Sequence, residues 1–308
     1  MTLAAHLSPS DDLRHHPTTG NRMRDSLFWE VIVPEEEIGM QVYLYVTDSG
    51  RVGYNAVVWG AELDPLALRL GSGRIPDTAD FNDFSFDGLT LRQAEPLQSC
   101  VMTYRGDGLE IEFDFHGIHD AFSYHANPDG LPTWFAANRM EQTGRVNGSI
   151  QIGDRHIRLD HVGHRDHSWG VRDWGVPQHW KWFVAYTPDG AAVNGWIWIA
   201  KGEWGFGGYV TRDGVAVPIR TIDHHADYDD QMRQQHLSAT LIDIHGGRTE
   251  VTLDAFGVVE LPTHDRMTTV IREAACRATI DGAPGAGQFE THWVGSYLEH
   301  LTLAASKR

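Results

Sequence analysis

Apolar and polar residues alternate along most of this chain with a period of two, which is the pattern of half-buried β-strands. Between residues 109 and 115 the apolar side chains occupy one face and three acidic side chains the other. Further β-branched and aromatic stretches, at 41–47, 53–59, 180–186 and 194–200, end near Asp, Gly or Pro residues. No long segment shows the 3.6-residue period of an amphipathic helix. We therefore predict an all-β sandwich or barrel protein with very little helix.

Short Gly-containing turns locate several hairpins. The dipeptides Gly153-Asp154 and Asp281-Gly282 each separate two apolar stretches, as a two-residue hairpin turn does. The strands that they join are predicted at 146–152, 156–162, 268–280 and 287–297. Residues 64–70 fit a short helix, and residues 71–88, which are rich in Gly, Pro and Asp, fit a loop.

The two halves of the chain resemble each other. Residues 45–59 and 186–198 both run from a Tyr through an Asp-containing turn into a strand with a Trp. We predict a flexible arm at 1–25 and two β-barrel or sandwich domains at 26–174 and 175–308, with one large sandwich as the alternative. Ligand sites in such proteins often lie at domain interfaces and in barrel mouths.

Charged side chains are concentrated in residues 163–174, just past the midpoint, where they lie among tryptophans. On one strand, successive side chains point to opposite faces. One face would carry Arg165, His167 and Trp169, and the other His164, Asp166 and Ser168. One of these sets must face a barrel interior or the second domain.

Asp166 and His167 are the candidate catalytic residues. A carboxyl group in an apolar cavity has a raised pKa and can act as an acid near neutrality. His167 would orient Asp166 or relay its proton, although direct contact needs a twist or bulge. The alternative is structural: Arg165, Asp166, Arg172 and Asp173 would form ion pairs that join the two halves.

Tryptophans supply the predicted apolar lining of a substrate pocket. Trp196 and Trp198 alternate with isoleucines, so both faces of their strand are apolar, one toward a core and the other toward a cavity or the sister domain. The predicted lining residues are Trp134, Trp169, Trp174, Trp182, Trp196 and Trp198. Arg165, Arg172 and Asp173 are predicted to be structural or orienting residues.

Metal and cofactor motifs are weak or missing. His161, His164, His167 and Asp166 are ligand types that suit zinc or iron, but their spacing matches no known ligand motif, so we predict no metal. The sequence has no P-loop, no GxSxG and no dinucleotide-binding glycine motif, and we predict no cofactor. A His/Asp metal-dependent enzyme remains an alternative.

Composition narrows the range of partners. The net charge of −17 argues against nucleic acid and anionic membrane surfaces. No apolar run reaches the 18 residues of a membrane-spanning helix. The two cysteines, Cys100 and Cys276, suggest no disulfide framework, so a cytoplasmic location is expected. The sequence leaves the oligomeric state open.

The run from His164 to Gly170, followed by Arg172-Asp173-Trp174, resembles a motif of tandem lipocalin-like proteins related to carotenoid 1,2-hydratase (hydroxyneurosporene synthase) and AttH-like proteins. The resemblance implies two lipocalin-like barrels with a largely apolar pocket in or between them. It also implies that Asp166 matches the proposed proton donor, and that His167 and Trp169 match pocket or motif residues.

Together these features predict a cofactor-independent enzyme, a lyase or an isomerase/cyclase. It would use acid catalysis for hydration, dehydration, isomerisation or cyclisation of an isoprenoid, steroid-like or aromatic molecule. A non-catalytic carrier of a hydrophobic ligand is the rival class.

Overall fold

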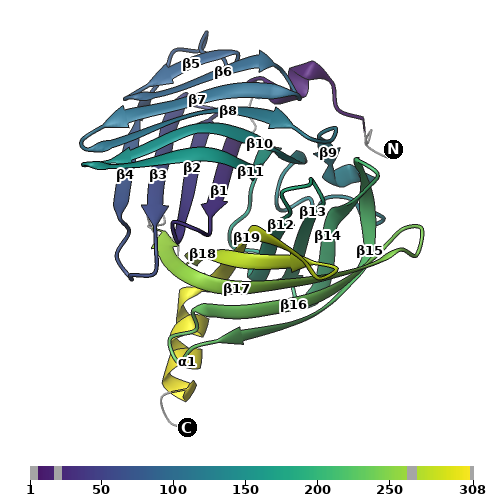
Figure 1. Ribbon diagram of the computed structural model, residues 1–308. Coiled ribbons are helices and arrows are strands. Elements are labelled where there is room, and N and C mark those ends of the chain that lie inside the picture. The colour runs from purple at the N-terminus through teal and green to yellow at the C-terminus, as the bar shows by residue number, and fades with distance from the viewer. Residues whose placement is uncertain (1–5, 17–22, 262–268, 306–308) are drawn as a thin grey trace.

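The computed structural model describes residues 6–16, 23–261 and 269–305, and within them β-strands predominate (Figure 1). The strands form two units. The first is an eleven-stranded, curled sheet, and the second is a closed barrel of eight strands. In Figure 1 the barrel, green to yellow, lies below the first sheet, purple to teal. The prediction of an all-β fold with two lipocalin-like units is confirmed.

The first sheet has the spatial order β4-β3-β2-β1-β11-β10-β8-β7-β6-β5, and β9 pairs with β10. Its strands are β1 (Arg24–Val33), β2 (Ile38–Thr47), β3 (Arg51–Trp59), β4 (Ala67–Arg74), β5 (Asp83–Phe86), β6 (Leu89–Glu95), β7 (Ser99–Gly106), β8 (Leu109–Gly117), β9 (Phe122–Ser123), β10 (Asn138–Ile152) and β11 (Arg155–Gly170). A 3₁₀ turn, η2 (Tyr124–Ala126), follows β9.

The barrel consists of antiparallel neighbours in chain order, and β12 pairs with β19 to close it. Its strands are β12 (Pro177–Tyr186), β13 (Ala192–Ala200), β14 (Glu203–Arg212), β15 (Val215–Tyr228), β16 (Gln234–Asp243), β17 (Arg248–Leu261), β18 (Thr269–Ile280) and β19 (Ala283–Val294). The helix α1 (Gly295–Ala305) follows. Among the described residues, no helix is long and apolar enough to cross a membrane.

Alternation along the strands produces three apolar clusters. One lies inside the curled sheet, another fills the barrel, and the third lies between the two units. On β13, Ile197 points into the barrel, whereas Trp196 and Trp198 belong to the cluster between the units. The prediction that one face of this strand meets a core and the other the sister domain is confirmed.

The predicted two-residue hairpins have the expected register. Ile152 pairs with Arg155 across Gly153-Asp154, and Ile280 pairs with Ala283 across Asp281-Gly282. Gly153 has a φ of +55°, a conformation that glycine adopts without strain. These registers fix which side chains face each other farther along both hairpins.

Local predictions were wrong in three places. Residues 67–74 form strand β4 rather than a helix, and β5 lies in the segment predicted as a loop. The strand predicted at 287–297 ends at Val294, where α1 begins. Short edge strands and chain ends bury little surface, so their apolar periodicity is weak.

Part of the predicted arm packs on the first sheet. The 3₁₀ turn η1 (Pro9–Asp12) places Asp12 in a fully buried position, and Arg14 is also buried. Arg14 donates hydrogen bonds to backbone carbonyls near β5, including that of Ala79 at 2.8 Å. Residues 1–5 and 17–22 of the arm, and 262–268 and 306–308 of the second predicted domain, lie outside the described residues.

Candidate functional site

A cavity of about 150 Å³ lies between the first sheet and the barrel. Strands β1, β2, β10 and β11 contribute one wall, and β12, β18 and β19 contribute the other. Aromatic lining residues include Phe28, Tyr43, Phe135, Trp174 and Trp180, and charged ones are Arg24, Arg139, Asp166, Arg172, Glu273 and Glu290. An apolar pocket with a few converging polar groups is the usual form of a small-molecule site.

Asp166 lines this cavity because even-numbered residues of β11 face the barrel. Its side chain is 14% exposed, and the Arg139 guanidinium donates a hydrogen bond to it at 2.7 Å. Burial raises the pKa of Asp166 to about 6, although the charge on Arg139 opposes the rise. Asp166 therefore has both of the surroundings weighed from the sequence, an aromatic cavity and an arginine partner.

Glu141 is the cross-strand neighbour of Asp166 on β10. It is fully buried, and Arg139 Nε lies 2.6 Å from its carboxylate. Burial raises the pKa of Glu141 to about 7, with Arg139 acting in the opposite direction. One arginine thus holds two carboxyl groups that would otherwise repel each other.

His164 and Trp182 complete the hydrogen bonding of Glu141. His164 Nε2 lies 2.5 Å from one carboxylate oxygen, and Trp182 Nε1 donates to the other at 3.2 Å. Burial lowers the pKa of His164 to about 3, so the ring is neutral and donates one N–H to Glu141. Trp182 belongs to the barrel, so this network also joins the two units.

A second pair of carboxyl groups lies on the barrel wall. Glu273 of β18 and Glu290 of β19 are cross-strand neighbours, and both line the cavity. Trp180 Nε1 donates a hydrogen bond to Glu290, and Gln288 donates one to Glu273 at 2.7 Å. Burial is the largest cause that raises the pKa of both groups, and their mutual repulsion raises that of Glu273 further. A proton shared by the pair relieves this repulsion.

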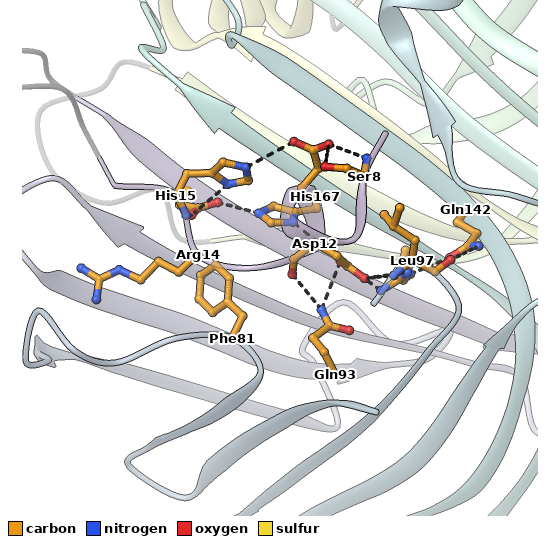
Figure 2. Close-up of polar contacts among 12 residues, drawn as sticks. Ser8, Asp12, Arg14, His15, Phe81, Gln93, Leu97, Gln142 and His167 are labelled. Carbon is orange, nitrogen blue, oxygen red and sulfur yellow. Dashed lines mark hydrogen bonds and ion pairs between the residues drawn. The ribbon is translucent and has the colours of Figure 1, made fainter. Parts of the chain in front are cut away.

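His167 and Arg165 lie on the opposite face of β11, inside the curled sheet. His167 Nε2 is 2.5 Å from Asp25 and its Nδ1 is 3.7 Å from Asp12, while Arg165 lies 3.1 Å from Asp12. Burial disfavours the imidazolium, but Asp25 and Asp12 outweigh it and raise the pKa of His167 to about 9. Figure 2 shows Asp12 beside His167 and Gln93.

This geometry does not provide the predicted contact between His167 and Asp166. The two side chains leave β11 in opposite directions, and the twist or bulge that contact requires does not occur, since the β10–β11 register is continuous. His167 binds the acids of the arm and of β1 instead. Its protonated ring and Arg165 balance the charges of Asp12 and Asp25.

The candidate metal ligands are divided in the same way. His164 and Asp166 face the barrel, whereas His167 lies inside the first sheet. A different set, His15, Asp25 and His167, has ligand atoms within 4.8 Å of one another. With Asp12 and Arg165 alongside, this set already forms a charge-balanced cluster, so its geometry is explained without a cation.

The other predicted site residues occupy varied positions. Trp174 lines the cavity, and Trp134, Trp182, Trp196 and Trp198 belong to the surrounding cluster between the units. Trp169 lies on the other face of β11, stacked on His15 at 4.0 Å. Arg172 lines the cavity and donates a hydrogen bond to Ser168 at 2.7 Å, while Asp173 accepts one from the Gly175 backbone.

Sequence reasoning missed Arg139, Glu141, Glu273 and Glu290 as site residues. The sequence contains a signal for three of them, Glu141, Glu273 and Glu290. Counting back from the turns at Gly153-Asp154 and Asp281-Gly282 places Glu141 opposite Asp166 and Glu273 opposite Glu290. Like charges directly opposite each other destabilise a sheet, so such pairs mark unusual surroundings.

Solved structures with the same fold cover nearly the whole chain. A putative AttH from Nitrosomonas europaea has a TM-score of 0.68 at 14% identity, covering 94% of this chain and 96% of its own. Kievitone hydratase from Nectria haematococca has a TM-score of 0.59 at 11% identity, with 92% of each chain covered. CghA has a TM-score of 0.57 at 10% identity, covering 89% of this chain and 88% of its own.

These similarities confirm, at the level of fold, the resemblance to AttH-like and hydratase-related lipocalin-like proteins. No curated protein matches the sequence significantly. One family model matches residues 8–295, which is most of the chain and includes both units. The chain belongs to the family described as Domain of unknown function (DUF7064).

Proposed function

We propose that this protein is a cofactor-independent acid–base enzyme that adds or removes water at a double bond of a hydrophobic small molecule. The substrate would bind in the cavity between the two units. A hydratase among the proteins of the same fold supports the reaction class. Isomerisation would use the same groups without loss of water. We extend the proposal to a cytoplasmic location, supported by two buried, free thiols, Cys100 and Cys276.

One observation carries the proposal: two carboxyl centres in different surroundings, one paired with an arginine and one without a cation among the described residues, line the same cavity. Asp166 is bound to Arg139 and, with a pKa of about 6, is mostly ionised at pH 7. Glu273 is buried and Glu290 half-buried, and neither has an ion-pair partner among the described residues; burial raises the pKa of both, that of Glu273 well above its usual value, which favours a proton shared by the pair. Where the surroundings give two carboxyl groups different pKa values, the group with the lower pKa can serve as the base and the other as the acid.

This assignment changes the role first considered for Asp166. The sequence suggested an acid in an apolar pocket, but Arg139 favours the carboxylate, so Asp166 serves better as the base. Glu290 lies beside Trp180 on the opposite wall and supplies the proton. The charge on Asp166 is among the causes that raise the pKa of Glu290, so the two groups act on each other across the cavity.

The reaction balances with these two groups. In the dehydration direction, Asp166 takes a proton from a carbon next to the one that bears a hydroxyl group. The glutamate pair gives its shared proton, through Glu290, to that hydroxyl, the C–O bond breaks, water leaves and the C=C bond forms. The proton on Asp166 then returns to the glutamate pair through water. Hydration is the reverse sequence, with Asp166 protonated and the glutamate pair ionised before each addition of water.

The test is a screen in H₂¹⁸O with unsaturated and hydroxylated isoprenoids, steroid-like molecules and aromatics, followed by mass spectrometry. Asp166→Asn should abolish turnover and leave ligand binding nearly intact. Asp160→Asn is the matched control, because Asp160 is exposed on the same strand. Full turnover by Asp166→Asn would refute the assignment. Tight binding by the wild type without any ¹⁸O incorporation or release would favour the rival carrier function.

A further inference from the structure

We propose that Arg24 and Arg172 form a binding subsite for a carboxylate group of the ligand. This inference names the substrate class of the proposed enzyme and rests on that function for its catalytic meaning. The ligand would be amphipathic, with an apolar portion in the cavity and a carboxylate at its entrance.

The two arginines lie where the cavity meets a wider opening. The inner cavity measures about 150 Å³, and an outer opening of about 600 Å³ shares Arg24, Arg172 and Trp174 with it. A cavity of about this size in another protein holds a benzene molecule, so the inner part suits one ring or a short isoprenoid arm. A larger ligand has to pass the arginines, and its remaining groups lie beside them.

Both guanidinium groups lack an acidic partner among the described residues. Arg139, by comparison, is paired with Asp166 and Glu141, and Arg165 is paired with Asp12. Arg172 donates hydrogen bonds only to neutral oxygens, Ser168 Oγ at 2.7 Å and the Phe135 carbonyl at 3.3 Å. Arg24 lies over the Tyr45 ring at 4.0 Å.

The electrostatic balance at this position favours an anion. Burial is the main cause that lowers the pKa of Arg172 to about 10; the charges of Arg24 and Arg139 add to it, whereas Tyr43 and the Asp166 carboxylate oppose it. Arg24 Nε is buried and has no hydrogen-bond acceptor among the described residues. Two poorly compensated guanidinium groups beside an apolar cavity are suited to a planar carboxylate, which accepts paired N–H donors.

The rings beside the arginines fit the same ligand. Tyr43 lies 5.6 Å from the Arg24 guanidinium, and Trp174 lies 5.2 Å from that of Arg172. These rings hold the two cations in place and give the bound molecule an apolar surface. The outer opening is also lined by Asp48, Asp173 and Arg51; Arg51 is exposed and does not line the inner cavity.

The experiment compares 1-naphthylacetic acid with 1-naphthaleneacetamide by isothermal titration calorimetry at pH 7.5. The two probes share the ring system and differ in charge. The wild type should bind the acid at least about tenfold more tightly than the amide, as expected for a partly buried charge pair. Arg24→Gln and Arg172→Gln should each remove most of this preference, and Arg24→Gln should lower the affinity for the acid far more than that for the amide. Arg51→Gln is the matched control and should retain the preference.

Equal affinity of the wild type for acid and amide, or failure to bind the acid, would overturn the proposal. So would an equal loss of preference in Arg51→Gln. Arg24→Gln is the decisive variant, because Arg172 also holds Ser168 and the Phe135 carbonyl and its loss affects local packing. 1-Naphthyl phosphate serves as a third probe, and tighter binding of it than of the acid would refute a carboxylate subsite.

The same measurement separates this inference from the proposed enzyme function. Binding is measured without turnover, so a protein that prefers the acid but releases no product is a carrier of anionic ligands with the subsite intact. A protein that turns over a substrate but shows no preference for the acid keeps the enzyme function and lacks the subsite.

Discussion

His167 offers a quantitative test of the ion cluster inside the first sheet. Its ring is fully buried between Asp25 and Asp12, and its pKa rises from the usual 6.5 to about 9. One pKa unit corresponds to 1.36 kcal/mol, so protonated His167 stabilises the folded state by about 3 kcal/mol. His167→Gln keeps a donor for Asp25 but removes the charge. We expect it to lower the free energy of unfolding by about 3 kcal/mol near pH 6.

The pH dependence identifies the cause. A histidine with a raised pKa in the folded state contributes its full stability below the unfolded value of about 6.5, and this contribution is lost as pH rises through 9. Asp12 and Asp25 have lowered pKa values and remain ionised over that range. The difference between wild type and His167→Gln should therefore be largest near pH 6 and small at pH 10.

Urea denaturation at pH 6, 8 and 10 measures these differences, and the melting temperature at pH 6 should fall by about 5–10 °C. His156→Gln is the matched control, because His156 is exposed on the same strand. A constant difference across this range, or one below about 1 kcal/mol at pH 6, would refute the charge-cluster argument. The assay also tests whether His167 is structural, since a catalytic partner of Asp166 would affect turnover without this pH-dependent loss of stability.

Two further predictions concern the cavity. Arg139→Met leaves Asp166 and Glu141 without their shared cation. The free energy of unfolding should therefore fall by about 3–5 kcal/mol at pH 8. The loss should be smaller at pH 5, because both carboxyl groups gain protons there. If Asp166 is the base of the dehydration, kcat/KM for dehydration by the wild type should decline as pH falls through about 6, the pKa of Asp166, and a dehydration activity that instead rises steadily below pH 6 would assign Asp166 the acid role.

The strands facing a core could be predicted from the sequence, because burial on one face imposes a strict period of two. The division of β11 into two faces followed from the same rule. The sequence did not indicate what each face of β11 contacts. The structure places Asp166 toward the barrel and His167 inside the first sheet. Short edge strands such as β5 escaped prediction, since polar and glycine residues carry no such period.

The ion-pair partners of the charged residues could not be predicted from the alternation of apolar and polar positions. Asp12 lies in a polar segment that predicts an arm, yet it is fully buried because Arg165 and His167 supply opposite charges from 153 and 155 positions farther along the chain. Nothing in the local sequence indicates that pairing. Similarly, Trp180 is one of several tryptophans at strand positions, and only the contact between two outer sheet faces brings it to the cavity.

The two acid pairs have a common structural origin. Each unit ends in a long two-stranded hairpin, β10–β11 in the first and β18–β19 in the second, and each hairpin carries two carboxyl groups directly opposite each other. Such pairs destabilise an isolated hairpin. In the first unit Arg139 compensates for the repulsion, whereas in the second burial and the repulsion itself raise the pKa of Glu273, which favours a proton on the pair.

Because the outer faces of these hairpins line the same cavity, a carboxyl group paired with an arginine and a carboxyl pair without a cation among the described residues lie in one site. Neither unit alone contains both groups. The proposed acid–base chemistry therefore depends on two β-units that compensate for the same repulsion in different ways. Removing this difference by Arg139→Met should leave Asp166 more protonated at pH 7 and thereby weaken the base, even in molecules that remain folded.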